Sequence, residues 1–293
     1  MTGMARTQIG NFVDAGGLRT FYLEQGEGPT MVLMHGSSVA MDSRVTWFKN
    51  IGALAEHFHV IAFDQPGFGH TDMPHQGRYL NRQERTQHAL DFLDVLGLET
   101  VILVGHSEGG YMGTRIAIEQ PDRIAKLIVV TSGGTAPRLG GDRDLSWMAA
   151  SKRAYDFTSR MANEEVFLET ARNSTFTHDE EFMNIMKENY SQSKKSGNFD
   201  IFRKLSEQET KSKPYTRLQE EHIHPYLPSL AVPTLLVWAH NDGTVPVERG
   251  LRLMELFVDC EMHVFDNARH MVMVDQAEKF SRLLLTWCGA GNG

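Results

Sequence analysis

The stretch TVILVGHSEGG, residues 100–110, joins a short apolar run to a glycine-flanked serine and then to a helix-compatible segment. Ser107 lies between Gly105 and Gly109 in the pattern G-x-S-x-G. This pattern is typical of a sharp strand-to-helix turn that holds the serine in a strained backbone conformation. Larger neighbours would collide with the adjoining strand and helix. Because an apolar run precedes the turn and a helical stretch to Gln120 follows it, Ser107 is a candidate nucleophile.

Strands and helices alternate on both sides of this turn. Residues 8–25, with the turn Ala15-Gly16-Gly17, predict a β-hairpin. Continuous apolar runs of a few residues are typical of strands buried on both faces of a parallel sheet. Such runs occur, with helix-periodic segments between several of them, at residues 30–34, 59–64, 100–107, 124–132, 232–240 and 260–267. This order predicts βαβ units and an α/β fold with a mostly parallel central sheet.

A long helix-periodic segment interrupts the alternation. From Ala136 to Pro228 the sequence has helical periodicity and no convincing strand. We therefore predict a core domain of residues 1–135 and 229–293 with a helical cap, residues 136–228, inserted between two of its strands. Large apolar side chains of the cap suggest an adaptable lid over a pocket. They are Trp147, Met148, Tyr155, Phe157, Met161, Phe167, Phe176, Phe182, Met183 and Met186.

A serine hydroxyl is a poor nucleophile at neutral pH and needs a base that is itself oriented by a carboxylate. For a serine in this type of turn, the acid and then the histidine follow in the chain. Asp242 comes after the run TLLVWAH, and His270 comes after MHVFD. The carboxyl ends of parallel strands meet at one edge of a sheet. We therefore predict a triad of Ser107, Asp242 and His270; Asp266, close to His270 in sequence, is a weaker candidate acid.

Backbone N–H groups are expected to stabilise the oxyanion that forms during acyl transfer. We assign these donors to Glu108, at the start of the helix after Ser107, and to Ser37, in a glycine-containing loop. The Glu108 side chain has two interpretations, an interaction with the helix N-terminus or a place in the pocket wall. Further pocket candidates are Ser38, His106, Trp147 and Met271.

Composition narrows the class of partner. The net charge of −8 disfavours a broad electrostatic contact with nucleic acid or an anionic membrane. No apolar stretch approaches the ~20 residues of a membrane helix, and the first ten residues lack the apolar core of a secretory signal. The two cysteines, Cys260 and Cys288, form no CxxC pair and are expected to be reduced. We expect a cytoplasmic enzyme with a small-molecule substrate, with a homodimer as its candidate assembly.

Metal binding has little support in the sequence. His222 and His224, in HIHP, suggest a pair of ligands, but no third ligand is indicated. We therefore predict a site that uses neither a metal nor an organic cofactor.

Six stretches together carry a resemblance to a known family. They are FVDAGGLRTFYLEQGEGP (12–29), VLMHGSS (32–38), VIAFDQPGFGHTD (60–72), GHSEGGYMG (105–113), PDRIAKLIVV (121–130) and NDGTVPVERG (241–250). The chain resembles the α/β-hydrolase-fold family over essentially its whole length. It looks most like the meta-cleavage product hydrolases, which cut a C–C bond in ring-fission products of aromatic degradation. The resemblance places the triad on Ser107, Asp242 and His270.

The chain departs from that subfamily in its pocket motifs. Residues 37–40 read Ser-Ser-Val-Ala where those hydrolases usually have a Gly-Pro-Gly-Ala-like loop. His106 stands where they usually have Asn, and Met271 stands where they usually have Trp. The resemblance also implies a cap arginine that holds the carboxylate of the substrate, for which Arg153, Arg160 and Arg172 are the candidates.

The predicted function is hydrolysis of a small, partly apolar carbonyl compound by a Ser-His-Asp triad. A carboxylesterase or lactonase is the alternative. A cofactor-free dioxygenase or a ligand sensor on the same fold is less favoured. Dehalogenases and epoxide hydrolases of this fold place Asp at the turn, and Ser107 counts against both.

Overall fold

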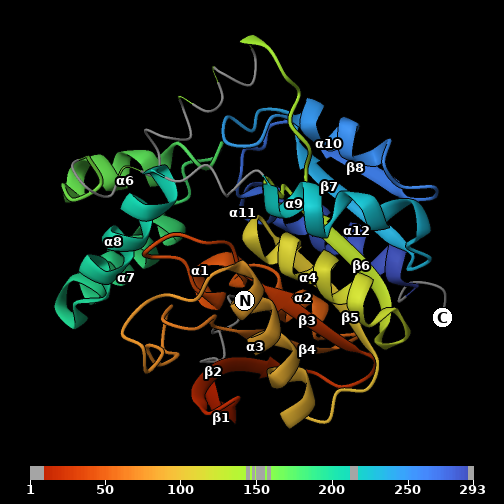
Figure 1. Ribbon diagram of the computed structural model, residues 1–293, viewed down its shortest axis with the longest axis horizontal. Helices are drawn as coiled ribbons and strands as arrows, with labels where there is room; N and C mark the ends of the chain where they lie inside the picture. The colour runs from red at the N-terminus through yellow and green to blue at the C-terminus, as the bar shows by residue number, and fades with distance from the viewer. Residues whose placement is uncertain are drawn as a thin grey trace, which may run out of the picture.

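The computed structural model describes residues 10–142, 146, 149, 156, 160–211 and 217–289. Eight strands form one sheet in the order β1-β2-β4-β3-β5-β6-β7-β8 (Figure 1). The pairs β1–β2 and β2–β4 are antiparallel, and all the other pairs are parallel. The strands are β1 (Gly10–Ala15), β2 (Leu18–Gln25), β3 (Thr30–Met34), β4 (His59–Phe63), β5 (Val101–His106), β6 (Ile124–Val130), β7 (Thr234–Ala239) and β8 (Glu261–Phe265). The predicted mostly parallel α/β sheet is confirmed.

The predicted hairpin is formed by β1 and β2. Ala15 pairs with Leu18, and the two residues between them have φ angles of +59° at Gly16 and +79° at Gly17. Glycine adopts positive φ without the steric penalty that a Cβ atom brings. The N–H of Gly17 also donates to Asp14 Oδ1 at 2.8 Å. The conformation of this turn therefore follows from the residues within it.

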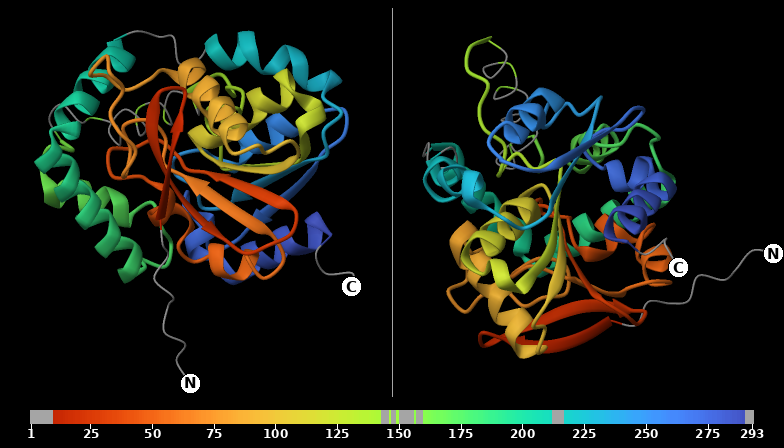
Figure 2. Two further views of the ribbon diagram at one scale, coloured as in Figure 1. Left: turned by 90° about the horizontal axis from the view of Figure 1, so that it is seen from below. Right: turned by 90° about the vertical axis from the view of Figure 1, so that its right-hand side faces the viewer.

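The sheet is covered by helices on both faces (Figure 2). Side chains alternate along each buried strand, so that in β3 Met31 and Leu33 pack toward one face and Val32 and Met34 toward the other. The first face is covered by α1 (Ser43–Trp47), α2 (Ile51–Leu54) and α12 (Ala277–Cys288). The second face is covered by α3 (Arg82–Val95), α4 (Glu108–Glu119) and α10 (Val247–Met254). Burial on both faces explains why these strands are continuous apolar runs.

Three helices between β6 and β7 stand together beyond one end of the sheet (Figure 1). They are α6 (Glu164–Arg172), α7 (Glu180–Ser196) and α8 (Asn198–Lys211). The first two begin at side chains that accept a backbone N–H, Asn163 for α6 and Asp179 for α7. Gly197, with φ +82°, ends α7. The described residues between β6 and β7 contain helices and no strand, as the helical periodicity predicts.

The last part of this segment packs on the core instead. It contains α9 (Arg217–His222) and the 3₁₀ helix η3 (His224–Ser229). Gln219 Nε2 donates to the Ala136 carbonyl at 2.7 Å, and His224 Nε2 lies 2.9 Å from the Thr135 carbonyl. These contacts hold the segment beside the chain that leaves β6.

Two short elements complete the core: η1 (Pro121–Arg123) precedes β6, and α11 (Val272–Asp275) lies between β8 and α12. The loops that follow β3, β5, β6, β7 and β8 leave the same edge of the sheet, because these strands run parallel. None of the helices within the described ranges combines the length and the apolar composition that crossing a bilayer requires.

Candidate active site

Ser107 forms the sharp turn between β5 and α4. Its backbone has φ +52° and ψ −111°, a conformation that costs energy in a residue with a Cβ atom. A Cβ atom on Gly105 would lie 2.2 Å from the carbonyl oxygen of Gly109, and one on Gly109 would lie 2.4 Å from that of Met34. The flanking glycines are therefore required, because helix α4 and strand β3 approach the turn as the pattern predicts.

His270 and Asp242 meet at the same edge of the sheet. His270 Nδ1 lies 2.9 Å from Asp242 Oδ2, and the aspartate side chain is fully buried. Its other oxygen, Oδ1, accepts the N–H groups of Thr244 at 2.7 Å and Val245 at 2.9 Å. Because a carboxylate accepts, His270 carries its proton on Nδ1, which leaves Nε2 as the basic nitrogen. Asp266 is exposed and contacts its neighbour Asn267.

The main-chain carbonyl of His270 is held by two side chains from the ends of neighbouring strands. His106 Nε2 and Thr131 Oγ1 each lie 3.1 Å from this oxygen. Thr131 has φ +41°, which is uncommon for a β-branched residue. Our sequence analysis did not select Thr131. Its place directly after the apolar run of β6 is the one sequence feature that points to it.

His106 is fully buried against the ring of His270, with ring centroids 4.8 Å apart. Burial, and then the charge of His270, lower the pKa of His106 well below its ordinary value. The neutral ring must carry its proton on Nε2, which faces the His270 carbonyl. Its Nδ1 is buried and has no hydrogen-bond partner within the described part of the chain.

The loop after β3 places Ser37 beside Ser107. A Cβ atom on Gly36 would lie 3.2 Å from Ser107 Cβ, so the glycine permits this approach. His35 shapes the loop: its Nδ1 donates to the Gly36 carbonyl at 2.6 Å, and its Nε2 accepts the N–H of Gln65 at 2.9 Å. Burial lowers the pKa of His35 to about 4, so the ring is neutral. Within the described ranges, no hydrogen bond uses the N–H of Ser37.

The Glu108 side chain turns away from Ser107 and is buried between two arginines of α3. Its carboxylate accepts Arg82 Nε at 2.7 and 2.8 Å and an Arg85 terminal nitrogen at 3.0 Å. Glu108 is not among the residues that line the cavity over Ser107. The interpretation that this side chain lines the pocket is therefore wrong, because α3 supplies two buried guanidinium groups and the carboxylate pairs with both. The predicted role of its backbone N–H is unaffected.

A cavity of about 290 Å³ lies over Ser107 and His270. Its roof comes from the cap and is mainly apolar, with Met161, Phe167, Ala171 and Met186. The core contributes most of the remaining wall, which includes Gly36, Ser37, Ser38, Met41, His106, Gly243, Thr244, Arg269 and Met271, and the α6–α7 connection adds Asn173 and Ser174. The structure thus brings three of the four further pocket candidates to one cavity. The fourth, Trp147, lies outside the described residues.

The cap arginines do not line this cavity where the structure describes them. Arg160 and Arg172 are exposed, and neither is part of its wall. Arg153 lies outside the described residues. Arg269, directly before His270, lines the cavity instead. Our sequence analysis did not select Arg269, although it directly precedes His270 in the chain.

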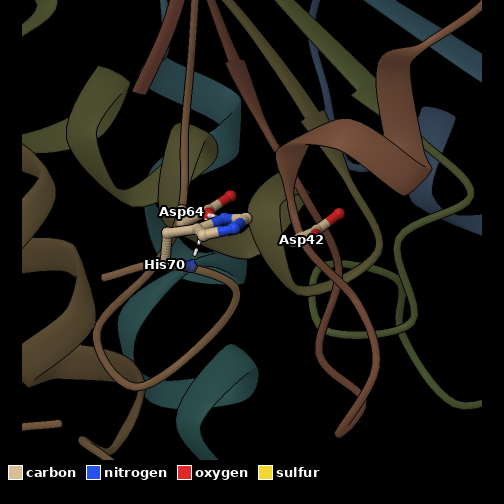
Figure 3. Close-up of side chains that lie close together, drawn as sticks. All are labelled: Asp42, Asp64 and His70. Carbon is tan, nitrogen blue, oxygen red and sulfur yellow. Dashed lines mark hydrogen bonds and ion pairs between the residues drawn. The ribbon is translucent and has the colours of Figure 1, made fainter. Parts of the chain in front are cut away.

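Asp42, Asp64 and His70 form a second cluster of groups that can bind metals, and their ligand atoms lie within 4.8 Å of one another (Figure 3). Protein donors already use the carboxylate oxygens. Asp64 accepts Ser43 through both N–H and Oγ, and it accepts the N–H of His70 at 2.9 Å. Asp42 accepts the N–H of Val45 and caps α1. The cluster therefore has a structural explanation, because it joins the loops that follow β3 and β4.

The two carboxyl groups of this cluster titrate differently. Burial, followed by the charge of Asp64, raises the pKa of Asp42 to about 7. Burial acts in the same direction on Asp64, but hydrogen bonds from His70 and Ser43 outweigh it and lower the pKa of Asp64. Asn189 of α7 donates to Asp42 Oδ2 at 2.8 Å, so the cluster also fastens the cap to the core.

The strand order, the turn at Ser107 and the paired His270 and Asp242 are those of an α/β-fold hydrolase. A family model described as "alpha/beta hydrolase fold" matches residues 29–277, and the chain belongs to this family. The predicted fold family and the predicted enzyme class are thereby confirmed.

The chain is similar to several hydrolases that are named for semialdehyde and dienoate substrates. It is 27% identical to a 2-hydroxymuconate semialdehyde hydrolase of Pseudomonas putida over 279 residues, which cover 94% of this chain and 93% of that protein. It is 28% identical to a 2-hydroxy-6-oxo-6-phenylhexa-2,4-dienoate hydrolase of Comamonas testosteroni over 276 residues, covering 90% and 89%. The predicted resemblance to meta-cleavage product hydrolases is confirmed.

Solved structures share the fold. A meta-cleavage product hydrolase from Pseudomonas fluorescens superposes with a TM-score of 0.79 at 24% identity and covers 97% of this chain and 99% of its own. An enol-lactonase from Burkholderia xenovorans superposes with a TM-score of 0.73 at 18% identity, covering 95% and 100%. Because both cleavage chemistries occur on this architecture, the fold alone does not choose between them.

Proposed function

We propose that this chain is a serine hydrolase that cleaves a C–C bond next to a carbonyl group in ring-fission products of aromatic degradation. The observation that carries the proposal is that Ser107 and His270 line one cavity while His270 Nδ1 is hydrogen-bonded to buried Asp242. The relatives named for dienoate and semialdehyde substrates support the choice of substrate class. The largely apolar cap roof suits the carbon skeleton of such compounds.

In the proposed mechanism, His270 Nε2 removes the proton of Ser107 Oγ as this oxygen attacks the substrate carbonyl carbon. The carbonyl oxygen becomes an oxyanion that accepts the N–H groups of Ser37 and Glu108. The adjacent C–C bond then breaks, and the imidazolium gives its proton to the leaving carbon. Water, deprotonated by His270, then attacks the acyl-serine ester, and the imidazolium returns this proton to Ser107 Oγ as the ester bond breaks and the carboxylic acid is released.

An ester or lactone is the second candidate substrate. Four of the five residues that differ from the usual pattern of the C–C hydrolases, Ser37, Ser38, His106 and Met271, line the cavity, and the fifth, Val39, is buried outside its wall. The wall therefore differs in chemistry where it surrounds the reacting group. With an ester, the same steps apply and the proton goes to an alkoxide oxygen instead of carbon.

Turnover of dienol ring-fission products and of 4-nitrophenyl esters, measured in parallel, tests this proposal. We expect the C–C substrate to be preferred in kcat/KM. Ser107→Ala should lose nearly all activity toward both, with residual catalysis roughly 10³–10⁴-fold above water. Ester turnover without C–C cleavage would favour the second candidate. Wild-type rates in folded Ser107→Ala protein would refute the triad.

The remaining expectations from the sequence stay predictions. We propose residues 1–135 and 229–293 as the core domain and 136–228 as the cap, within which α9 and η3 lie against the core. Limited proteolysis would test these boundaries. Light scattering would test the homodimer, and cell fractionation would test the cytoplasmic location.

A further inference from the structure

Arg269 brings a permanent positive charge to the wall of the cavity. It directly precedes His270 in the loop after β8, and both residues line the same space. The wall contains no aspartate or glutamate among the residues that the structure describes. Arginine stays protonated throughout the physiological range, whereas His106, one of the two buried histidines of the wall, is neutral. Arg269 is therefore the one permanently charged residue of the described wall.

The guanidinium is not neutralised by the protein. Within the described ranges Arg269 forms no ion pair, and its side-chain hydrogen bond runs from a terminal nitrogen to the Asn173 carbonyl at 3.1 Å. Asp275 lies nearby, but it accepts only the backbone N–H of Arg269, at 2.9 Å. Its carboxylate is also occupied by N–H groups of Phe176 and Thr177. The remaining N–H donors of Arg269 can thus serve a ligand.

The position of Arg269 suits recognition at the entrance of the site. Arg269 is half-buried and Asn173 is exposed, so the wall that these two residues form reaches the protein surface. The Asn173 carbonyl restrains the guanidinium, and the neighbouring N–H of Met271 donates to Ser174 at 3.1 Å. These two contacts join the loop that carries His270 to the α6–α7 connection of the cap. A planar guanidinium held in this way is suited to a carboxylate, which it can bind through two parallel hydrogen bonds.

We propose that Arg269 binds a carboxylate of the substrate at the entrance of the cavity, beside the scissile bond. This inference deepens the proposed function and rests on it: the substrate is an anionic carbonyl compound, and its anchor is a core residue adjacent to His270. Arg160 and Arg172, the two described residues among the three cap arginines that the resemblance suggested, are exposed outside the wall and are not the anchor.

Kinetics with two matched esters test the anchor. One is 4-nitrophenyl hydrogen glutarate, which carries a carboxylate, and the other is its neutral methyl ester, 4-nitrophenyl methyl glutarate. Removal of a hydrogen bond to a charged group typically lowers affinity by about 10- to 100-fold. Arg269→Gln should therefore lower kcat/KM for the anionic ester by about that factor, mainly through KM. The neutral ester should change by less than about threefold.

Two control variants separate the anchor from general effects of charge. Arg172→Gln removes an exposed arginine near the same connection and should leave the ratio of the two kcat/KM values unchanged. Arg269→Lys keeps the charge without the planar donor pair and should restore part of the preference. An equal response of both esters to Arg269→Gln, or the same loss in Arg172→Gln, would overturn the proposal.

A binding measurement separates failure of the anchor from failure of the proposed function. Monomethyl glutarate and dimethyl glutarate are titrated calorimetrically into Ser107→Ala, which cannot turn over either compound if the triad is correct. We expect the anion to bind at least about tenfold more tightly, and this preference should vanish when Arg269→Gln is added. If the wild type cleaves neither the C–C substrates nor the esters, but Arg269→Gln still removes the preference for the anion, the anchor is upheld and the proposed function is refuted. Absence of the preference in Ser107→Ala refutes the anchor.

Discussion

Replacement of Glu108 by glutamine should strongly destabilise the protein. The Glu108 carboxylate contacts Arg82 at 2.7 Å and Arg85 at 3.0 Å, and the three side chains are at most 4% exposed. A neutral amide at this position would leave the buried guanidinium groups without their charge partner. Breaking a buried ion pair on one side costs about 3–5 kcal/mol in the free energy of unfolding. At about 2–4 °C per kcal/mol for a domain of this size class, Tm should fall by roughly 6–20 °C.

Thermal and urea unfolding, followed by circular dichroism, measure this effect. Glu188→Gln is the matched control, because Glu188 pairs with Arg44 at 3.2 Å with both side chains about half or more exposed. An exposed pair of this kind contributes about 0–1 kcal/mol. If Glu108→Gln were no more destabilised than this control, the buried ion cluster would not have the stabilising role that its geometry indicates.

The same variant also checks that the Glu108 side chain lies outside the pocket. Its carboxylate faces α3, so KM should respond equally for the anionic and the neutral glutarate ester. A selective fall in KM for the anionic ester would show that the carboxylate repels substrate, contrary to the structure. The measurement uses a temperature well below the reduced Tm.

Two further predictions concern the acid of the triad and acid stability. Asp242→Asn should lower kcat on the order of 10⁴-fold, because an amide at this position favours the wrong His270 tautomer. Asp266→Asn should leave kcat nearly unchanged. The reverse order of the two effects would refute the assignment of the acid. Burial lowers the pKa of His88 to about 4, so its contribution to stability is present above about pH 6.5 and is lost as the pH falls toward 4. Between pH 8 and pH 5 the wild-type protein should therefore lose about 2 kcal/mol more unfolding free energy than the His88→Gln variant. Urea midpoints that change with pH in the same way in both proteins would contradict this.

Features that depend on short-range patterns were predictable from the sequence. Apolar runs mark buried strands because every residue of such a strand faces one of two helical layers. Gly16 and Gly17 mark the hairpin because the turn needs positive φ. Gly105 marks the turn at Ser107 because the backbone of Gly109, four residues later, leaves no space for a Cβ atom. In each case the deciding contacts follow from the local conformation of the chain.

The surroundings of the reactive residues were decided by tertiary packing. Glu108 meets Arg82 and Arg85, 26 and 23 positions away, because α4 packs against α3. His106 and Thr131 reach the His270 carbonyl across 164 and 139 positions, because three strands end at one edge of the sheet. The periodicity of a sequence reports which face of an element is buried. It carries no information on which distant side chain fills that face, so the partners of these residues emerge only from the packed structure.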